Sequence, residues 1–242
     1  MTRDLLEGIE VVVFDKDGTL IEFHRMWRGW VGTLGDELSR HTGVDVRGKL
    51  YALMGVDRET GRVYPHGLLA ATPMARIRDL VVEALIDEGI DKARAGEAIE
   101  AAWHAPDPVA LATPVTDLRR LFDALHERGL RLAVATSDDR DPTERTLRAL
   151  GLGGDFEVLA CADDGHQVKP APDSIHVIAA AMGVPPDRML VVGDAPADLR
   201  MAAAAGVARR VGVLTGVGDR ATLEPLADIV VDSIQALLPP EA

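Results

Sequence analysis

Two aspartates separated by one residue follow the first strongly apolar run of the chain, in the stretch VVVFDKDGTL at residues 11–20. Side chains two residues apart on an extended chain point to the same side, so Asp15 and Asp17 can address one small volume while Lys16 points away from it. Like charges repel in a partly dry site, and a divalent cation such as magnesium, which prefers carboxylate oxygens, would relieve that repulsion. One carboxylate could then attack an electrophile while the other moves protons.

The residues before the aspartates form the element that must position them. Three of the four residues at 11–14 are β-branched, and the run is too short to favour a helix. We therefore predict a buried strand that ends near Gly18. Ligands bind at the carboxyl ends of strands in open α/β sheets, which is where both aspartates would stand. The alternative is a strand followed by an acidic turn, because aspartate and glycine are common turn formers.

Two later apolar runs lead into residues that suit phosphate binding. Thr136 and Ser137 follow the run at 132–135. A hydroxyl with free amides at a strand end can hold a phosphate oxygen, although these residue types also cap helices. Lys169 follows the run at 156–160 by a short loop, and the proline after it biases it toward an extended conformation. Its ammonium can then reach back as a point charge for an oxyanion.

A further apolar run, at 189–192, leads into two more aspartates. Asp194 stands at the end of this predicted strand, as Asp15 does in the first one. Asp198 lies four residues later, one turn into the following helix, so Asp194 and Asp198 can face the same side. Each of four predicted strands thus ends in residues able to bind a cation or a phosphate group.

From Thr113 onward, helical and strand patterns alternate. Strands are predicted over 130–135, 156–160, 189–192, 207–213 and 229–231, and the helices between them begin near residues 114, 141, 172 and 196. This alternation predicts an α/β fold with a Rossmann-like, mostly parallel sheet, helices on both faces and right-handed crossovers. Residues 1–21 and 113–242 would form this α/β core.

Residues 22–112 have a different character. All three tryptophans and both tyrosines lie there, and the segment has no strong buried-strand pattern. Helices are predicted over the apolar stripes 27–38 and 74–85, the second after an N-cap at Thr72-Pro73, and over 93–104. We therefore predict a small, mainly helical domain inserted after the first strand, with linkers at 18–23 and 105–113.

One part of this insertion, residues 54–65, is less regular and predicts a short hairpin or an exposed loop. It carries Arg58 and Arg62, which belong either to a solvated surface or, with Arg25, to a surface that contacts a substrate. The tryptophans are interpreted as core between helices rather than as a stacking platform.

Composition narrows the class of protein. The chain has 242 residues, 47% of them apolar but only nine aromatic, which allows a sizeable aliphatic core. Its formal net charge of −13 argues against nucleic acid or an anionic membrane as a partner. No run approaches eighteen apolar residues, and the N-terminal residues are too polar for a signal peptide. With a single cysteine, Cys161, the expectation is a protein of a reducing compartment, the cytoplasm.

The combination Asp-x-Asp-Gly-Thr, Thr, Lys-Pro and Gly-Asp-x-x-x-Asp, in that order after successive strands, resembles the haloacid dehalogenase-like hydrolase superfamily. The chain is most similar to the phosphatase branch with a helical cap inserted after the first strand, the phosphoglycolate phosphatase and β-phosphoglucomutase type. The resemblance covers nearly the whole chain, and residues 22–112 would then be the cap domain. A departure is Ser137, where close relatives often carry asparagine.

This resemblance implies a role for each matched residue. Asp15 would be the nucleophile that forms an aspartyl-phosphate, and Asp17 the acid and base that protonates the leaving oxygen and then activates water. The phosphate would be bound by Thr136, Ser137 and Lys169 and by the backbone of Lys16 and Gly18. Mg²⁺ would be held by Asp15, the backbone carbonyl of Asp17 and Asp194, with Asp198 supporting the metal shell. The cap residues match no family pattern that would carry over a substrate specificity. Arg25, Arg58 and Arg62 are candidates for contacts to the rest of the substrate because a cap over the site could supply cations there.

The implied function is magnesium-dependent hydrolysis of a small phosphorylated metabolite. A phosphomutase uses the same residues and stays open as the alternative. A dehalogenase needs neither the second aspartate nor a metal, and a phospho-receiver module is about half this length and orders its residues differently. A non-catalytic binding protein would be expected to lack at least one of the five polar positions. The motifs do not decide the identity of the phosphate monoester or the oligomeric state.

Overall fold

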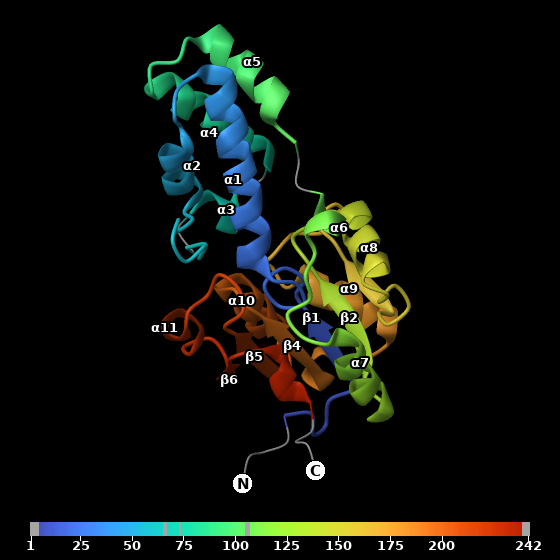
Figure 1. Ribbon diagram of the computed structural model, residues 1–242. Coiled ribbons are helices and arrows are strands. Elements are labelled where there is room, and N and C mark those ends of the chain that lie inside the picture. The colour runs from blue at the N-terminus through green and yellow to red at the C-terminus, as the bar shows by residue number, and fades with distance from the viewer. Residues whose placement is uncertain (1–4, 65–66, 73, 105–106, 239–242) are drawn as a thin grey trace. The chain divides into compact units, whose positions relative to one another are not determined.

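The computed structural model describes residues 5–64, 67–72, 74–104 and 107–238 (Figure 1). The chain divides into two compact units, one made of Met1–Phe23 and Pro108–Ala242 and the other of His24–Asp107. Pro73 of the predicted N-cap, parts of the predicted segments 54–65 and 105–113, and the first residues of the polar N-terminus lie outside the described residues.

Six parallel strands form one sheet in the first unit, which confirms the predicted α/β class. They are β1 (Val11–Phe14), β2 (Arg131–Ala135), β3 (Val158–Ala160), β4 (Met189–Gly193), β5 (Arg209–Val213) and β6 (Ile229–Val231). Their order across the sheet is β3-β2-β1-β4-β5-β6. The chain therefore builds outward from β1 to β3 and then returns to the other side of β1, so β1 and β4 are the two strands at which the direction of winding reverses.

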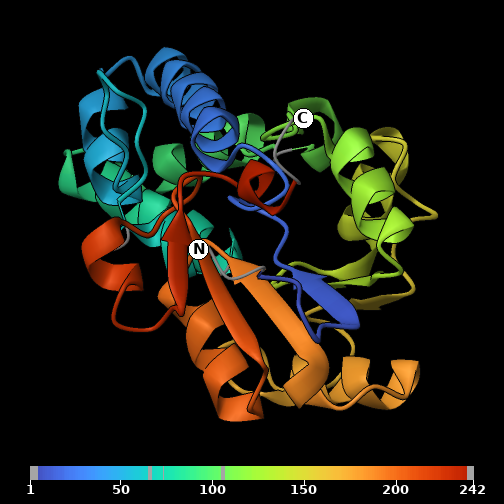
Figure 2. The same ribbon diagram turned by 90° about the horizontal axis from the view of Figure 1, so that it is seen from below.

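Helices cover both faces of this sheet, as Figure 2 shows from below. The helices of this unit are α6 (Pro108–Leu111), α7 (Leu118–Glu127), α8 (Arg140–Ala149), α9 (Asp173–Met182), α10 (Pro196–Ala205) and α11 (Arg220–Leu223), with short 3₁₀ turns η1 (Pro186–Arg188) and η2 (Ile234–Leu237). Helices α7 and α8 contribute to the apolar core on one face, and α9 and α10 to the core on the other.

The strand β1 explains why the opening apolar run has no polar residue. Val12 and Phe14 belong to the core on one face, while Val11 and Val13 belong to the core on the opposite face. All four side chains are completely buried. A strand covered on both faces needs a continuous apolar run rather than an alternating one. Each of these side chains contributes about 1.5–3 kcal/mol on burial, so the strand that positions the aspartates is firmly held.

Some predicted boundaries were wrong. The helix expected from about residue 114 begins at Leu118, because the Asp117 carboxylate accepts a hydrogen bond from the Arg120 amide and caps the helix there. The segment before it pairs instead with the first connection: Glu22 donates its amide to the Thr113 carbonyl, and Val115 donates to the Leu20 carbonyl. The two segments that lead into and out of the helical unit therefore start side by side.

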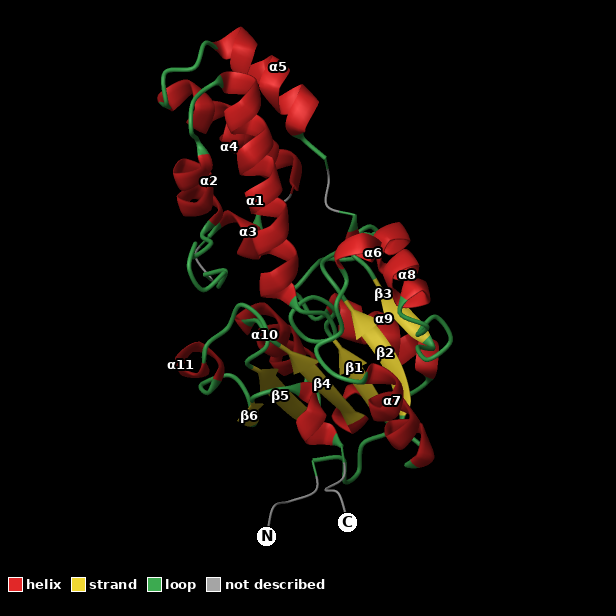
Figure 3. Ribbon diagram, in the orientation of Figure 1, coloured by secondary structure: helices red, strands yellow, loops and turns green. Residues whose placement is uncertain are grey.

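The second unit is mainly helical, and Figure 3 shows no strand in its described residues. Its helices are α1 (Phe23–Thr42), α2 (Arg47–Met54), α3 (Leu68–Ala71), α4 (Met74–Asp87) and α5 (Lys92–Ala102). Trp27, Trp30 and Trp103 pack edge to face, with ring centroids 5.6 Å and 5.3 Å apart in successive pairs. The short helices α2 and α3 were not predicted. An antiparallel bridge between Val56 and Val63 closes the less regular segment as a small hairpin.

Candidate active site

Asp15 and Asp194 stand at the carboxyl ends of β1 and β4, the two strands at which the winding of the sheet reverses. Phe14 is level with Val192 in the parallel register, and the Asp15 amide donates to the Val192 carbonyl at 2.9 Å. Asp15 is 9% exposed and Asp194 is 3% exposed. The register therefore brings together two carboxylates that are 179 residues apart in the sequence, at the position where α/β sheets bind ligands.

Lys169 reaches this edge from the loop after β3. Its ammonium lies 2.5 Å from Asp15 Oδ1 and 2.6 Å from Asp198 Oδ1, and its side chain is 4% exposed. Burial lowers the pKa of Lys169, but the charges of Asp15 and Asp198 outweigh that effect and raise it overall. Lys169 therefore carries a positive charge in the site and joins two of its carboxylates.

Asp194 is enclosed by backbone. Its Oδ2 accepts a hydrogen bond from the Val217 amide at 2.7 Å, and its carbonyl accepts one from the Gly218 amide. A Cβ on Gly216 would lie 1.9 Å from Asp194 Oδ2, and one on Gly18 would lie 2.6 Å from the same atom. Gly18 also has a φ of +90°. Glycine is therefore required at both places, because any side chain would displace this carboxylate.

Asp15, Asp194 and Asp198 form a group in which one carboxylate oxygen of each lies within 4.8 Å of the others. Burial and then the neighbouring charges of Asp15 and Asp198 raise the pKa of Asp194 well above its usual value. Burial likewise raises the pKa of Asp15 to about 6, against the lowering effect of Lys169. Oxygen donors crowded in this way fit a hard divalent cation, whose charge would reverse these shifts.

Asp198 has a second partner that fixes its position. Its Oδ2 accepts a hydrogen bond from the Ala195 amide at 2.9 Å, near the start of α10. One carboxylate oxygen thus binds the backbone of its own helix and the other binds Lys169. This arrangement fits the supporting position at a metal that the family resemblance implies for Asp198, which stays a prediction.

The Lys16 side chain does not point away from Asp17. The alternation of side chains along an extended chain predicted that it would, and that prediction was wrong. The Lys16 ammonium lies 2.7 Å from both Asp17 carboxylate oxygens and 2.8 Å from Asp138 Oδ2. Strand β1 ends at Phe14, and the Lys16 carbonyl accepts hydrogen bonds from the Leu20 and Ile21 amides, so the chain already turns at Lys16 and the strand alternation does not continue through it. Burial raises the pKa of Asp17 to about 7, although the Lys16 charge lowers it.

Thr136 and Ser137 follow β2 directly. Thr136 is 4% exposed, and its hydroxyl accepts a hydrogen bond from the Asp138 amide at 3.1 Å. Its own amide donates to the Ala160 carbonyl and so extends the pairing of β2 with β3. Ser137 is exposed. Both residues lie at the same edge of the sheet as Asp15, because β2 is the neighbour of β1.

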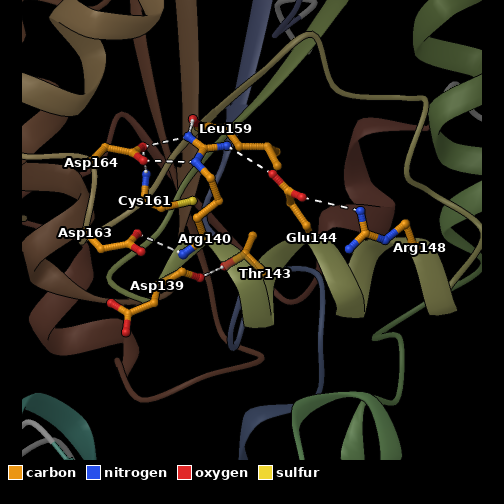
Figure 4. Close-up of polar contacts among 9 residues, drawn as sticks. All are labelled: Asp139, Arg140, Thr143, Glu144, Arg148, Leu159, Cys161, Asp163 and Asp164. Carbon is orange, nitrogen blue, oxygen red and sulfur yellow. Dashed lines mark hydrogen bonds and ion pairs between the residues drawn. The ribbon is translucent and has the colours of Figure 1, made fainter.

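The loop that leads from β3 toward Lys169 is fastened to α8 by Arg140 (Figure 4). The guanidinium donates to both Asp164 carboxylate oxygens, at 3.0 Å and 2.8 Å, and to the Leu159 carbonyl. The Asp164 carboxylate in turn accepts a hydrogen bond from the Cys161 amide. The Cys161 thiol is buried, and burial raises its pKa to about 11. These contacts order the start of the loop that carries Lys169.

The three arginines that are candidates for substrate contact all lie in the helical unit, Arg25 in α1 and the other two in the small hairpin. Arg25 and Arg62 are exposed. The Arg58 guanidinium lies 5.7 Å from the centre of the Tyr51 ring, a cation–π distance. At the hairpin, the Val63 amide donates to His24 Nδ1 at 3.0 Å, so the segment that carries Arg58 and Arg62 is fixed to the start of α1. Their contact with a substrate stays a prediction.

Sequence reasoning missed two groups of site residues. One is Asp138, which directly follows Thr136 and Ser137 in the sequence and completes the contacts of Lys16. The other is the segment after β5, where Thr215 donates its hydroxyl to the Gly18 carbonyl at 2.5 Å and Val217 binds Asp194. The signal for the second was present, because Gly216 and Gly218 follow an apolar run at the same edge of the sheet.

The family of the chain follows from its similarity to known proteins. The model of the haloacid dehalogenase-like hydrolase family matches residues 9–206, which span most of the chain. The chain belongs to this family. A phosphoglycolate phosphatase of Rhodospirillum rubrum is 30% identical to it over 200 residues, 82% of this chain and 77% of the relative. The resemblance to the phosphatase type is thereby confirmed, and this haloacid dehalogenase-like hydrolase is an enzyme of the phosphatase class.

Solved structures support the fold of this hydrolase. A haloacid dehalogenase-superfamily hydrolase of Geobacter sulfurreducens has a TM-score of 0.66 at 20% identity and covers 96% of this chain and 97% of its own. An enzyme described as a putative β-phosphoglucomutase, from Thermotoga maritima, has a TM-score of 0.64 at 22% identity and covers 95% and 97%. Within the described residues of the hydrolase, every helix is too short or too polar to cross a bilayer.

Proposed function

We propose that this hydrolase cleaves small phosphate monoesters in a magnesium-dependent reaction through an aspartyl-phosphate on Asp15. The observation that carries the proposal is the meeting of Asp15, Lys169 and Asp194 at one edge of the sheet. Thr136 and Asp17 lie at the same edge, after the neighbouring strands β2 and β1. These residue types together supply a nucleophile, a proton carrier, cations and hydroxyl donors for a phosphoryl group.

In the first half of the reaction, an Asp15 carboxylate oxygen attacks phosphorus and the bond from phosphorus to the ester oxygen breaks. The leaving oxygen takes a proton from Asp17. Lys169 and the Thr136 hydroxyl bind the oxygens of the phosphoryl group and neutralise the charge that spreads over them, with the Lys16 backbone and Ser137. The Gly18 amide, which the family resemblance also assigned to the phosphate, donates instead to the Ile21 carbonyl at 2.8 Å. The raised pKa of Asp17, about 7, supports its ability to hold that proton near neutral pH.

In the second half, Asp17 takes a proton from a water molecule, whose oxygen attacks phosphorus. The bond between phosphorus and the Asp15 oxygen breaks, and inorganic phosphate leaves with Asp15 restored as a carboxylate. The same group therefore acts first as acid and then as base, so one residue serves both half-reactions.

Magnesium would be held by Asp15, Asp194 and the Asp17 carbonyl, with Asp198 beside them. When bound it neutralises the phosphoryl oxygens and orients the phosphorus. The three-carboxylate group within 4.8 Å supports this assignment. Without a cation, this negative group would repel a phosphate dianion.

A small phosphorylated metabolite is the proposed substrate, and the relative named as a phosphoglycolate phosphatase makes 2-phosphoglycolate the first compound to test. The helical insertion lies between Asp17 and Thr136 in the sequence, where it can act as a cap that excludes macromolecules. Arg25, Arg58 and Arg62 are its candidate contacts to the part of the substrate that does not react. The net charge of −13 also repels polyanions such as nucleic acids. The single, buried cysteine fits the cytoplasm as the place of action.

The test is release of inorganic phosphate from 2-phosphoglycolate, β-glucose 1-phosphate, a phosphopeptide and a terminally phosphorylated oligonucleotide. We expect kcat/KM for the better small monoester to exceed that for the peptide or oligonucleotide by about 100-fold or more, because a capped site excludes bulky chains. A preference for either macromolecule would contradict the proposal. Conversion of β-glucose 1-phosphate to glucose 6-phosphate without phosphate release would identify the enzyme as the alternative, a phosphomutase.

A further inference from the structure

Lys16 is a buried lysine between two aspartates of the site, and the mechanism above uses only its backbone. Its side chain is 2% exposed. An ammonium has three N–H donors, and three carboxylate oxygens lie within reach: both oxygens of Asp17, at 2.7 Å each, and Asp138 Oδ2, at 2.8 Å. The contacts thus match the donors of the group one for one.

We propose that the Lys16 side chain is a positioning residue that holds the Asp17 carboxylate in place for proton transfer to the leaving oxygen. The inference rests on the proposed function, in which Asp17 is the proton carrier. Lys16 would not touch the substrate and would act through Asp17.

Lys16 pairs with two carboxylates, those of Asp17 and Asp138, and stability alone does not account for a buried charge there. A buried ion pair is weak evidence for stability, because the desolvation of both charges offsets much of their attraction. The residues before it in β1 are all apolar and completely buried, so an apolar side chain would suit the end of this strand equally well. A group that binds both oxygens of one carboxylate restricts the rotation of that carboxylate. A proton carrier needs such restriction, because its oxygen must stay within hydrogen-bond distance of the leaving oxygen.

Asp138 fixes Lys16 from the other side. Its side chain is 41% exposed, and it follows Thr136 at the end of β2, where its amide binds the Thr136 hydroxyl. Lys16 therefore links the residues after β1 to the residues after β2, two strands that pair in the sheet. Through Lys16, the position of the Asp17 carboxylate is fixed by both strand ends.

The positioning role has a kinetic signature that a purely structural role lacks. Protonation of the leaving oxygen matters for a basic leaving group such as phenolate and hardly matters for 2,4-dinitrophenolate, which leaves unprotonated. A variant that misplaces Asp17 should therefore lose kcat/KM on phenyl phosphate but not on 2,4-dinitrophenyl phosphate. A variant that disturbs the whole site should lose both equally.

The experiment measures kcat/KM on phenyl, 4-nitrophenyl and 2,4-dinitrophenyl phosphate for wild type, Lys16→Met, Lys16→Arg and Asp17→Asn. For Lys16→Met we expect a loss of about 10- to 100-fold on phenyl phosphate, a fraction of the contribution of general acid catalysis, and less than about threefold on 2,4-dinitrophenyl phosphate. Lys16→Arg keeps the charge and moves the donors, so a smaller loss with the same dependence on leaving group is expected. If circular dichroism shows that Lys16→Met is not folded, the dependence on leaving group is measured on Lys16→Arg alone.

Lys49→Met is the matched control, because it makes the same substitution at a lysine of the helical unit whose side chain is 40% exposed and pairs with Glu88 at 3.2 Å. Its dependence on leaving group should equal that of wild type within about twofold. If the Lys16 variants lose kcat/KM equally on all three esters, or lose none, the inference is wrong. The proposed function would still stand in that case, provided that Asp17→Asn loses kcat/KM selectively on phenyl phosphate. An Asp17→Asn variant with unchanged kinetics would instead overturn the proposed function itself.

Discussion

Replacing Asp15 by asparagine is expected to lower kcat for the best small monoester by about 10⁴- to 10⁶-fold, the range found when a nucleophile is removed. The amide has nearly the shape of the carboxylate but is not a nucleophile toward phosphorus. Lys169 keeps its contact with Asp198, so the loop that carries it should stay in place. The measurement is steady-state phosphate release, with thermal unfolding to show that the variant is folded.

Asp232→Asn is a suitable control for this change, because its side chain is 93% exposed and pairs only weakly with Arg220 at 3.5 Å. It removes the same charge at the end of β6, three strands away from β1 in the sheet, and should keep the wild-type rate. Near-wild-type turnover by folded Asp15→Asn would show that Asp15 is not the nucleophile.

Removal of divalent cations is expected to abolish turnover nearly as completely. Exhaustive chelation should lower kcat by at least about 10³-fold, since a bound metal contributes several kcal/mol to stabilisation of the transition state. Added Mg²⁺ should restore the rate. Ca²⁺ should bind but support little turnover, because its looser coordination tolerates a misplaced nucleophile.

Binding of Mg²⁺ can also be measured without an activity assay, through its effect on the stability of the protein. Mg²⁺ at 100 times its dissociation constant should raise the free energy of unfolding by about 2.7 kcal/mol in the wild-type chain. Asp194→Asn should lose most of that increase, whereas Asp232→Asn should keep it. Full activity after chelation, or an equal increase in Asp194→Asn, would contradict the assignment of the metal to this group.

The sheet and its functional edge could be predicted because their signals are local. A strand covered on both faces must be apolar throughout, and Val11 to Phe14 meet that condition with all four side chains buried. Parallel strands bring their carboxyl ends to one edge, so polar residues after four such runs had to meet there. Asp15, Lys169 and Asp194 therefore come together as expected.

The features that escaped prediction depend on contacts between distant segments. The alternation of an extended chain could not reveal that Lys16 is held by Asp138, 122 residues later, because strand β1 ends at Phe14 and the alternation no longer applies at Lys16. The backbone amide of Val217 that binds Asp194 carries no side-chain signal of its own, and only the glycines on either side of it mark the segment in the sequence. The short helices α2 and α3 have too few residues for their periodicity to be recognised.

The central claim is that the phosphoryl group passes through Asp15. The most direct test is a rapid acid quench of the enzyme during turnover of its best small monoester with Mg²⁺, followed by borohydride reduction and peptide mass spectrometry. Borohydride converts an aspartyl-phosphate to homoserine, so we predict homoserine at position 15 in the quenched wild-type enzyme and its absence in Asp15→Asn. Reduction at another carboxylate, or an unmodified Asp15 while phosphate is released at the full rate, would contradict the mechanism.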